Sequence, residues 1–456
     1  MIGGRKYQEL RERVVKRTTT LTFYGGVGEV GGNKILLQDG DTRIFLDFGM
    51  SIAMKKRYYS TPFLSPRNEQ SLLAFGILPD IRGIYEFEEG ERSVDVVFLT
   101  HSHSDHAAYI SFIKRSIPIY CGETTATILK ALDETRVSRF EFDLEGVNFN
   151  TFRTGDKIRI GTVEVEPIHV DHSVPGAYGF LIHTSSGTVA YTGDFRLHGS
   201  KPELSEDFIR AAADSRPIAL ITEATNMMGA EISSEQEVEE KICRLIGETP
   251  GLVLADFAGT DVDRLNSFNR SCRRCGRSLA VTMRQAHLMR RLQGDPRLEV
   301  PDIQDGGILV FQKEKKRYFG WEKEIMGLGN TVDASRVAAM QSRVVLVCSF
   351  YDFEELIEIK PLPESCYVLS ASEPYDEEME LDFERLTNWL IHYGLPQYHI
   401  HVSGHIMPLQ LRQALRTIGA KKVFPVHCQH PQLFNRFVRN MGSTIILAEK
   451  EKEYAL

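Results

Sequence analysis

The sequence predicts a layered α/β fold, an αββα sandwich into which a second α/β domain is inserted. Three stretches of different character lead to this prediction. Residues 1–226 carry short apolar strands separated by turns and a few helices, which suits half of the sandwich. Residues 227–385 alternate strand-like and helical segments, which is typical of a parallel sheet. Residues 386–456 return to the first pattern, so the first domain is expected in two parts.

The elements expected in each part follow from apolar patterning and from turn residues. In the first part, the expected strands are Lys34–Leu37, Arg43–Leu46, Val94–Thr100, Pro118–Cys121, Val163–Ile168, Gly179–His183 and Thr188–Thr192. The insert begins with an amphipathic helix at Glu231–Ile246. Toward the C-terminus we expect a helix at Glu377–Tyr393, a proline-initiated helix at Pro408–Ile418 and a strand at Lys422–Val426. Residues 1–20 are polar and basic and are expected to form a helix or a loose arm.

Composition limits the class of protein. The chain has 456 residues, of which 42% are hydrophobic and 25% charged, as in a folded globular protein of two or three domains. Its net charge of −8 is unusual for a nucleic-acid binder, which usually carries a basic surface. A local basic patch or bound cations could offset that charge. The acidic balance also leaves a small-molecule hydrolase as an alternative.

The cysteines and apolar runs indicate a cytoplasmic protein without a membrane segment. Seven cysteines without paired spacing argue against a disulfide framework and for a reducing compartment. Cys272 and Cys275 form a single CxxC with no second ligand pair nearby, so ordinary thiols are favoured over a zinc site. No apolar run approaches the ~18 residues of a membrane span, and no signal core follows the N-terminus.

The densest functional signal is the run His101-Ser102-His103-Ser104-Asp105-His106, directly after the apolar segment Asp95–Thr100. Side chains alternate along an extended strand, so His101 and His103 should point the same way, while Asp105 and His106 turn away and can serve a second ion. Imidazole and carboxylate together suit zinc and similar divalent ions. A polar loop that is rich in histidine by chance is the alternative.

Further ligand candidates lie at other strand ends. Asp47, Asp194 and His427 each follow an apolar strand, and His172 lies in a segment after another. A lone histidine beside an apolar run is more often an ordinary structural residue. Several strands that each end in Asp or His form a stronger pattern, because one edge of a layered α/β fold can gather them.

Together these segments resemble a known family. The HxHxDH run, Asp47 in Ile44–Gly49, the His172 segment and the segment Tyr191–Asp194 look like the four motifs of the metallo-β-lactamase fold. Three later positions look like motifs A, B and C of its β-CASP nuclease branch: Glu223, His405 and His427. The glycine-rich opening Gly25–Asn33 is similar to the start of ribonuclease J. The resemblance extends from about residue 20 to the C-terminus.

The resemblance implies a centre of two divalent ions, zinc first, with manganese or magnesium as alternatives. His101, His103 and His172 would hold one ion; Asp105, His106 and His427 would hold the other; Asp194 would bridge them. Such ions, ~3.5–4 Å apart, can share a water and lower its pKa for attack on a phosphodiester. Asp47 would orient a ligand imidazole from behind.

Other roles are implied by motifs A and B. His405 would lie beside the scissile phosphate as a catalytic group together with Asp105, and Glu223 would hold His405 by a hydrogen bond. Ser403 and Gly404 would contact phosphate through the backbone. The remaining histidines are interpreted as ordinary, with His169 the competitor of His172.

The expected activity is that of a ribonuclease. In the β-CASP branch, histidine at motif C accompanies RNA processing, whereas DNA-repair members carry valine, so His427 favours RNA. The chain is most similar to the short archaeal ribonuclease J, because few residues precede its first strand and it stops soon after His427. That similarity implies 5′→3′ exonuclease action on single-stranded RNA, a preference for a 5′-monophosphate, and a homodimer.

Alternatives remain at this stage. The first is a β-CASP endoribonuclease in RNA 3′-end processing. The second is a small-molecule metallohydrolase, against which the insert, His405 and His427 weigh. The third is a non-catalytic RNA-binding scaffold, which the filled ligand positions disfavour.

The sequence departs from the family pattern at Phe257–Arg264, where many family members carry Ser, Asn and His. This departure puts details of the contact with RNA and with its 5′ end in doubt.

Overall fold

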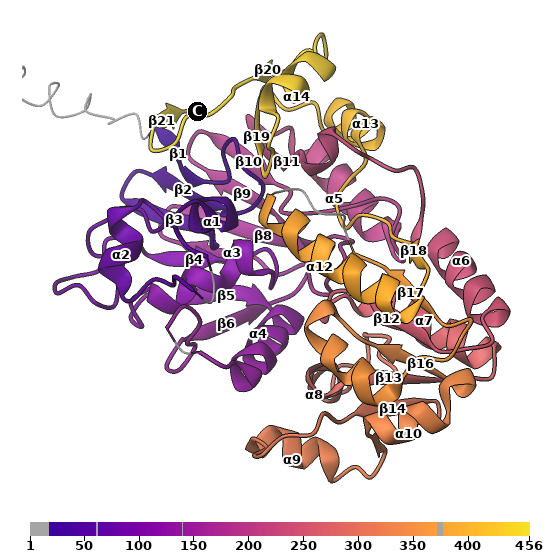
Figure 1. The fold of residues 1–456 in the computed structure, drawn as a ribbon. Coiled ribbons are helices and arrows are strands. Elements are labelled where there is room, and N and C mark those ends of the chain that lie inside the picture. The colour runs from indigo at the N-terminus through magenta and orange to yellow at the C-terminus, as the bar shows by residue number, and fades with distance from the viewer. Residues whose placement is uncertain (1–17, 61–62, 139, 372–376) are drawn as a thin grey trace, which may run out of the picture.

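A computed structural model describes residues 18–60, 63–138, 140–371 and 377–456 (Figure 1). Within these residues, the strands form three sheets of seven strands each. Two sheets pack against each other, and the third lies beside them with its own helices (Figure 1). The N-terminal arm expected at residues 1–20 lies almost wholly outside the described residues.

The first sheet is mixed. It is antiparallel from β21 to β3 and parallel from β3 to β6, and the last strand of the chain pairs with the first. In spatial order its strands are β21 (Glu453–Ala455), β1 (Thr19–Gly25), β2 (Lys34–Asp39), β3 (Thr42–Phe48), β4 (Val96–Phe98), β5 (Ile119–Gly122) and β6 (Phe149–Phe152).

The second sheet takes strands from both ends of the chain. Its strands in spatial order are β20 (Thr444–Ile445), β19 (Lys422–Val426), β11 (Ala219–Glu223), β10 (Gly187–Tyr191), β9 (Tyr178–Thr184), β8 (Val163–His169) and β7 (Ile158–Ile160). Strand β19 pairs in parallel with β11, which precedes it by about two hundred residues. The C-terminal part therefore completes the first domain, as the sequence pattern predicts.

The inner faces of these two sheets form one apolar core. Phe98 of the first sheet and Phe180 and Phe424 of the second are all fully buried there. Helices cover the outer faces. Those over the first sheet are α1 (Ile52–Tyr58), α2 (Glu69–Ala74), α3 (Ser104–Ala107), the 3₁₀ helix η1 (Ala108–Phe112) and α4 (Glu123–Thr135); those over the second are α5 (Pro202–Ser215), α13 (Pro408–Ile418) and α14 (Pro431–Phe437). The expected αββα sandwich is confirmed.

The third sheet belongs to the insert and is parallel throughout. Its strands in spatial order are β15 (Thr331–Val332), β14 (Ile308–Phe311), β13 (Ser278–Thr282), β16 (Val344–Val347), β12 (Val253–Asp256), β17 (Cys366–Leu369) and β18 (Gln397–His399). Because both faces are covered by helices, its central strands are continuous apolar runs.

The helices of the insert alternate with its strands. They are α6 (Glu235–Glu248), α7 (Val262–Arg274), α8 (Met283–Leu292), α9 (Gly320–Met326), α10 (Ala334–Ala339), α11 (Leu356–Ile359) and α12 (Glu377–Tyr393). Short 3₁₀ helices occur at η2 (Thr225–Met227), η3 (Gln341–Arg343) and η4 (Phe350–Glu355). The inserted α/β domain with a parallel sheet is thus present as expected.

The packing of α12 and β18 bears on where the insert ends. Residue 385 falls inside α12, and Leu386, Leu390 and Leu395 pack into the core of the third sheet. Strand β18 also pairs with β17 of that sheet. A helix and strand that bury their apolar faces in one domain belong to it. We therefore propose that the chain returns to the first domain after His399.

All seven cysteines are free thiols. Cys272 is buried in the core of the insert, and its partner in the CxxC, Cys275, has its sulfur 3.9 Å from that of Cys243. In the part of the chain that the structure describes, no helix is long and apolar enough to cross a membrane.

A buried ionic network joins the two domains. Arg264 on α7 is fully buried and donates two hydrogen bonds to the carboxylate of Glu235, at 2.9 and 3.1 Å. Arg196 of the first domain lies 3.9 Å from the same carboxylate and donates to Asp263 at 2.5 Å. Burial opposes the ionisation of Glu235, but Arg264 and Arg196 lower its pKa to about 2. The network therefore stays charged at neutral pH.

We expect Arg264→Met to lower the free energy of unfolding by about 3–5 kcal/mol, because the substitution leaves the buried carboxylate of Glu235 without its closest cationic partner. Arg274→Met is the matched control. Arg274 lies on the same helix, but it is 61% exposed and 3.9 Å from Glu239, so its loss should cost under about 1 kcal/mol. Denaturant unfolding of both variants measures the difference, and equal effects would contradict a stabilising role for the network.

Candidate metal centre

Four strand ends meet at one edge of the sandwich. His101 follows β4, Asp194 follows β10, Glu223 ends β11 and His427 follows β19. Strands β10, β11 and β19 run parallel and adjacent, so their carboxyl ends lie together. The grouping expected from strand ends in the sequence is therefore present in the structure.

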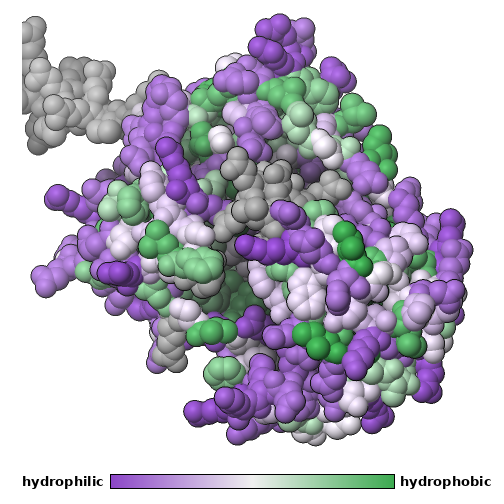
Figure 2. Space-filling view, viewed as in Figure 1, coloured by the Kyte–Doolittle hydropathy of each residue, from purple (hydrophilic) through white to green (hydrophobic). Residues whose placement is uncertain are grey.

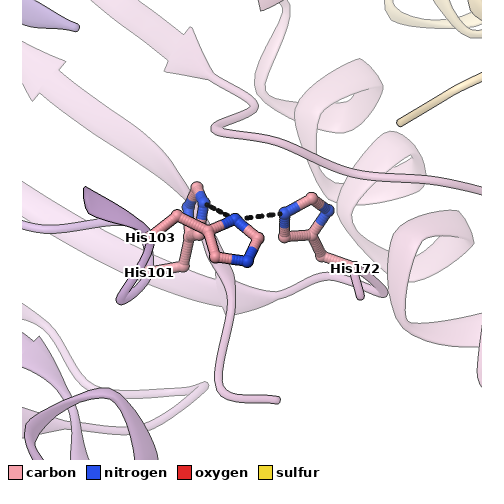
Figure 3. A group of neighbouring side chains, drawn as sticks. All are labelled: His101, His103 and His172. Atoms are coloured by element: carbon pink, nitrogen blue, oxygen red, sulfur yellow. Dashed lines mark hydrogen bonds between the residues drawn. The ribbon is translucent and has the colours of Figure 1, made fainter. Parts of the chain in front are cut away.

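One histidine group consists of His101, His103 and His172 (Figure 3). Nδ1 of His103 lies 3.1 Å from Nε2 of His101 and 3.2 Å from Nε2 of His172. Burial lowers the pKa of His103 to about 4 and holds the pKa of the other two well below the usual value. Three neutral imidazoles with converging nitrogens suit a divalent cation.

A second group consists of Asp105, His106 and His427. Nε2 of His427 is 2.9 Å from Oδ2 of Asp105, and Nε2 of His106 is 3.9 Å from it. Although burial opposes it, His106 and His427 hold the pKa of Asp105 below its usual range. An ionised carboxylate among imidazoles again provides a donor set for a divalent ion.

Asp194 lies between the two groups. Its Oδ2 is 3.1 Å from Nε2 of His106, 3.6 Å from Nε2 of His427 and 3.7 Å from Nε2 of His101. Its Oδ1 is buried and has no hydrogen-bond partner among the described residues. An unpaired buried carboxylate oxygen is costly, so this orphaned atom fits a cation bound beside Asp194.

Buried hydrogen bonds orient His106 from behind. Nδ1 of His106 donates to Oδ2 of Asp47 at 2.8 Å, which turns Nε2 toward Asp194. Asp47 also accepts from the Thr100 backbone N–H and from the Tyr191 hydroxyl, each at 2.7 Å. Nδ2 of Asn33 lies 3.3 Å from Nε2 of His106. These contacts fix the ring before any ion binds.

The backbone is strained at two of these positions. Asp47 has φ 59° and His427 has φ 51°, a left-handed conformation that non-glycine residues rarely adopt. Asp47 is the penultimate residue of β3 and His427 directly follows β19, and the bend aims each side chain into the site. At Gly49 a side chain would overlap the carbonyl of Asp105, so glycine is required for this close approach. Strain of this kind is concentrated at functional sites.

His405 enters from the segment after the insert. Its Nδ1 lies 3.2 Å from Oε1 of Glu223 and 3.7 Å from Oδ2 of Asp194. Burial lowers its pKa, but Glu223 and Asp194 raise the pKa of His405 to about 9. The side chain is 21% exposed. His405 is thus a cationic group that borders the site and keeps Nε2 available.

The loop that carries His405 is tied to the first domain. The Gly404 carbonyl accepts from Nδ1 of His172 at 2.7 Å, and the Ser403 hydroxyl donates to Oδ1 of Asn226 at 3.2 Å. His198, interpreted from the sequence as ordinary, donates to the Ser403 carbonyl at 2.8 Å. Ser403 and Gly404 therefore use polar groups to position neighbours, and their contact with phosphate stays a prediction.

The structure brings all the predicted site residues together. Besides the two groups above, Asp194, His405 and His427 also offer atoms close enough to hold an ion, so geometry leaves His405 as a possible ligand. The competitor His169 stacks on Tyr178 at 5.0 Å and joins none of these groups.

Sequence patterns missed four residues that support the site: Asn33, Thr100, Tyr191 and Thr225. The Thr225 hydroxyl donates to Oε2 of Glu223 at 2.7 Å and lies 2.8 Å from Nδ1 of His427. Tyr191 and Thr100 stand near strand ends, next to the motifs. That position is the sequence signal that could have identified them as supporting residues.

Comparison with known proteins agrees with this geometry. Residues 79–228 match the family model described as a beta-lactamase superfamily domain. A crystal structure of a protein of unknown function from Enterococcus faecalis V583 superposes with a TM-score of 0.76 at 21% identity, covering 96% of this chain and all of that one. The chain therefore has the fold of the metallo-β-lactamase class, with candidate ligands gathered at one edge.

Within that class, the chain is similar to ribonuclease J. It is 24% identical to ribonuclease J of Thermus thermophilus over 440 residues, 92% of this chain and 70% of that one. It is 24% identical to ribonuclease J of Sinorhizobium meliloti over 369 residues, 77% of this chain, and spans only 60% of that protein's length. The chain is a ribonuclease J-like protein of the metallo-β-lactamase fold, as its motifs predict.

We expect Tyr191→Phe to weaken divalent-ion binding by about 10–100-fold, because Asp47 loses a donor that fixes its orientation toward His106. Tyr367→Phe is the matched control: its buried hydroxyl donates to Oδ2 of Asp256 at 2.7 Å, but in the insert. Titration of the metal-free protein with zinc or cobalt compares the two. Equal metal affinity in both variants would exclude this role for Tyr191.

Proposed function

We propose that this chain is a metal-dependent ribonuclease that hydrolyses phosphodiesters in single-stranded RNA. The observation that carries the proposal is Asp194, whose carboxylate faces both ligand groups and retains an unpaired oxygen. Similarity to ribonuclease J over most of the chain supports RNA as the substrate.

We infer that two divalent ions are held here, one by His101, His103 and His172 and the other by Asp105, His106 and His427, with Asp194 between them. Imidazole and carboxylate ligands suit zinc first, with manganese or magnesium as alternatives. When bound, such ions supply a water of lowered pKa and positive charge for the phosphate oxygens. Asp47 then acts by orienting His106.

His405 is suited to the leaving oxygen. Its Nδ1 faces Glu223 and Asp194, so its Nε2 points away from both carboxylates and can donate a proton to a substrate atom. Glu223 keeps the ring protonated and fixed, and Glu223 itself is held by Thr225 and by the Phe195 backbone N–H at 3.1 Å. Asp105 belongs to the catalytic set through the ion that it holds.

The direction of cleavage follows from the resemblance. We propose 5′→3′ exonuclease action with preference for a 5′-monophosphate, and internal cleavage as the competing mode. The insert faces the first domain across a hollow that is visible in Figure 2, which suits a single strand. A homodimer and a cytoplasmic location stay predictions.

We expect time courses on 5′-labelled RNA to release labelled mononucleotide early, while 3′-labelled RNA shortens progressively. A 5′-triphosphate should slow the reaction, because a pocket shaped for one phosphate disfavours a bulkier, more charged group. Chelation of metal ions should abolish cleavage, and Asp194→Asn serves as the inactive control. Internal fragments of fixed size from both labels would instead establish an endonuclease.

We expect His405→Ala to slow cleavage by about 10²–10⁴ while both ions remain bound, because a proton donor is lost and not a ligand. His427→Ala should lose one ion. His430→Ala, an exposed histidine on the same segment, is the control and should change neither quantity. Metal content and cleavage rate are measured for all three. Loss of an ion in His405→Ala with full occupancy in His427→Ala would reverse the assignment.

A further inference from the structure

Residues 51–76 form a basic and aromatic segment in an otherwise acidic chain. The segment carries four cationic side chains and one carboxylate, whereas the whole chain has a net charge of −8. It also contains exposed or half-buried aromatic rings. The relevant side chains are Lys55, Lys56, Arg57, Tyr58, Phe63, Arg67, Glu69 and Phe75. Aromatic rings among cations are the composition of a single-strand binding surface.

The segment starts at the metal centre. The Met50 backbone N–H donates to the Ser104 carbonyl at 2.9 Å, next to Asp105, and Ser51 caps the first turn of α1. Helix α1 then runs seven residues to Tyr58, about 10 Å at ~1.5 Å per residue. A strand bound at the metal centre therefore needs only about three stacked nucleotides, at ~3.4 Å each, to reach its far end.

Three side chains form a stack at that end. The rings of Tyr58 and Phe75 lie 4.3 Å apart and nearly parallel, at 16°. The Arg57 guanidinium lies over Tyr58 at 5.7 Å. Phe75 is 41% exposed, so part of its ring remains open to solvent. We call Arg57, Tyr58 and Phe75 the aromatic platform.

Packing of the domain explains only part of this arrangement. Tyr58 and its neighbour Met54 pack against the core under the first sheet. The exposed part of Phe75 contributes nothing to that core, and nearby Phe63 and Leu64 are 90% and 56% exposed. On the left of Figure 2, where Figure 1 places α2, hydrophobic and hydrophilic side chains alternate at the surface.

The charge available at the platform is positive. Lys55 pairs with Glu141 at 2.6 Å and is therefore neutralised. Arg57 and Arg67 are exposed, and neither forms an ion pair with a residue that the structure describes. Guanidinium groups attract phosphate, and an open aromatic face accepts any base.

We propose that the aromatic platform binds single-stranded RNA a few nucleotides from the scissile bond, with a base stacked on Phe75 and the backbone close to Arg57. This inference rests on the proposed ribonuclease function, and it names a substrate contact outside the metal centre. Stacking on a ring needs unpaired bases, so the platform selects single strands over duplexes.

The test compares Phe75→Leu with Phe87→Leu. Phe87 is a close match: it is 36% exposed and stacks on Tyr85 at 5.0 Å, but its neighbours in the sequence are acidic. Binding of the metal-loaded protein is measured by fluorescence anisotropy with RNA that has non-hydrolysable linkages. The probes are a single strand of about fifteen nucleotides, its duplex and a dinucleotide.

Phe75→Leu should weaken binding of the long single strand by about 5- to 100-fold, the range for loss of one stacked base. The dinucleotide and the duplex should bind as they do to the unchanged protein, and Phe87→Leu should bind all three normally. A second variant, Arg57→Gln, should reduce the slope of log affinity against log salt by about 0.7 for one lost phosphate contact.

Several outcomes would overturn the proposal that the aromatic platform binds RNA. Normal binding of the long strand by Phe75→Leu, an equal loss in Phe87→Leu, or an equal loss for the dinucleotide would each reject it. A change of oligomeric state in Phe75→Leu with unaltered RNA binding would assign the surface to a second copy of the chain instead. If the unchanged protein binds the long strand but does not cleave its normal counterpart, the proposed function fails, while the binding comparison still decides the platform.

Discussion

The carboxylate of Asp194 sets the strongest constraint on this structure. It is buried at the end of β10 and is surrounded by imidazoles from several segments of the chain. A charge in such a place is tolerated only when opposite charge or hydrogen bonds surround it. Every segment that brings a histidine to Asp194 must therefore arrive at one edge of the sandwich. The C-terminal part has to return beside β11 for this reason, since His427 can reach the site only from β19.

This return makes the insert part of the site. Arg196, two residues after Asp194, lies in the buried network with Glu235 and Arg264. On the other side of the insert, the loop of His405 is held by His172 and His198 of the first domain. A shift of the insert would therefore move both the loop after Asp194 and the loop of His405. The orientation of the two domains and the geometry of the centre are coupled through these contacts.

The sequence predicts those features of the fold and site that depend on local residue patterns. His101, His103, Asp105 and His106 are adjacent, and strand ends mark Asp194 and His427, so the ligand candidates could be found without a structure. The parallel sheet of the insert followed from the same alternation. Tyr191 stands at a strand end beside a motif, but its role could not be predicted, because that role arises only when β10 and β3 face each other across the core. The end of the insert is hard to place from sequence, because the apolar pattern of α12 does not say which sheet the helix covers. The left-handed backbone of Asp47 and His427 is likewise imposed by tertiary contacts.

Net charge was the main argument against a nucleic-acid substrate, and the structure shows why the total is a poor guide here. Asp47, Asp105 and Asp194 are concentrated at the centre, where burial lowers the pKa of His101, His103 and His172 and so keeps these three imidazoles neutral. Two divalent ions would add four positive charges at this edge and so attract phosphate. Affinity for RNA and for metal would then reinforce each other, since coupling between two ligands is reciprocal. The basic segment that begins at Ser51 lies directly beside this edge, so positive side chains also line the path proposed for the substrate, although the chain as a whole is acidic.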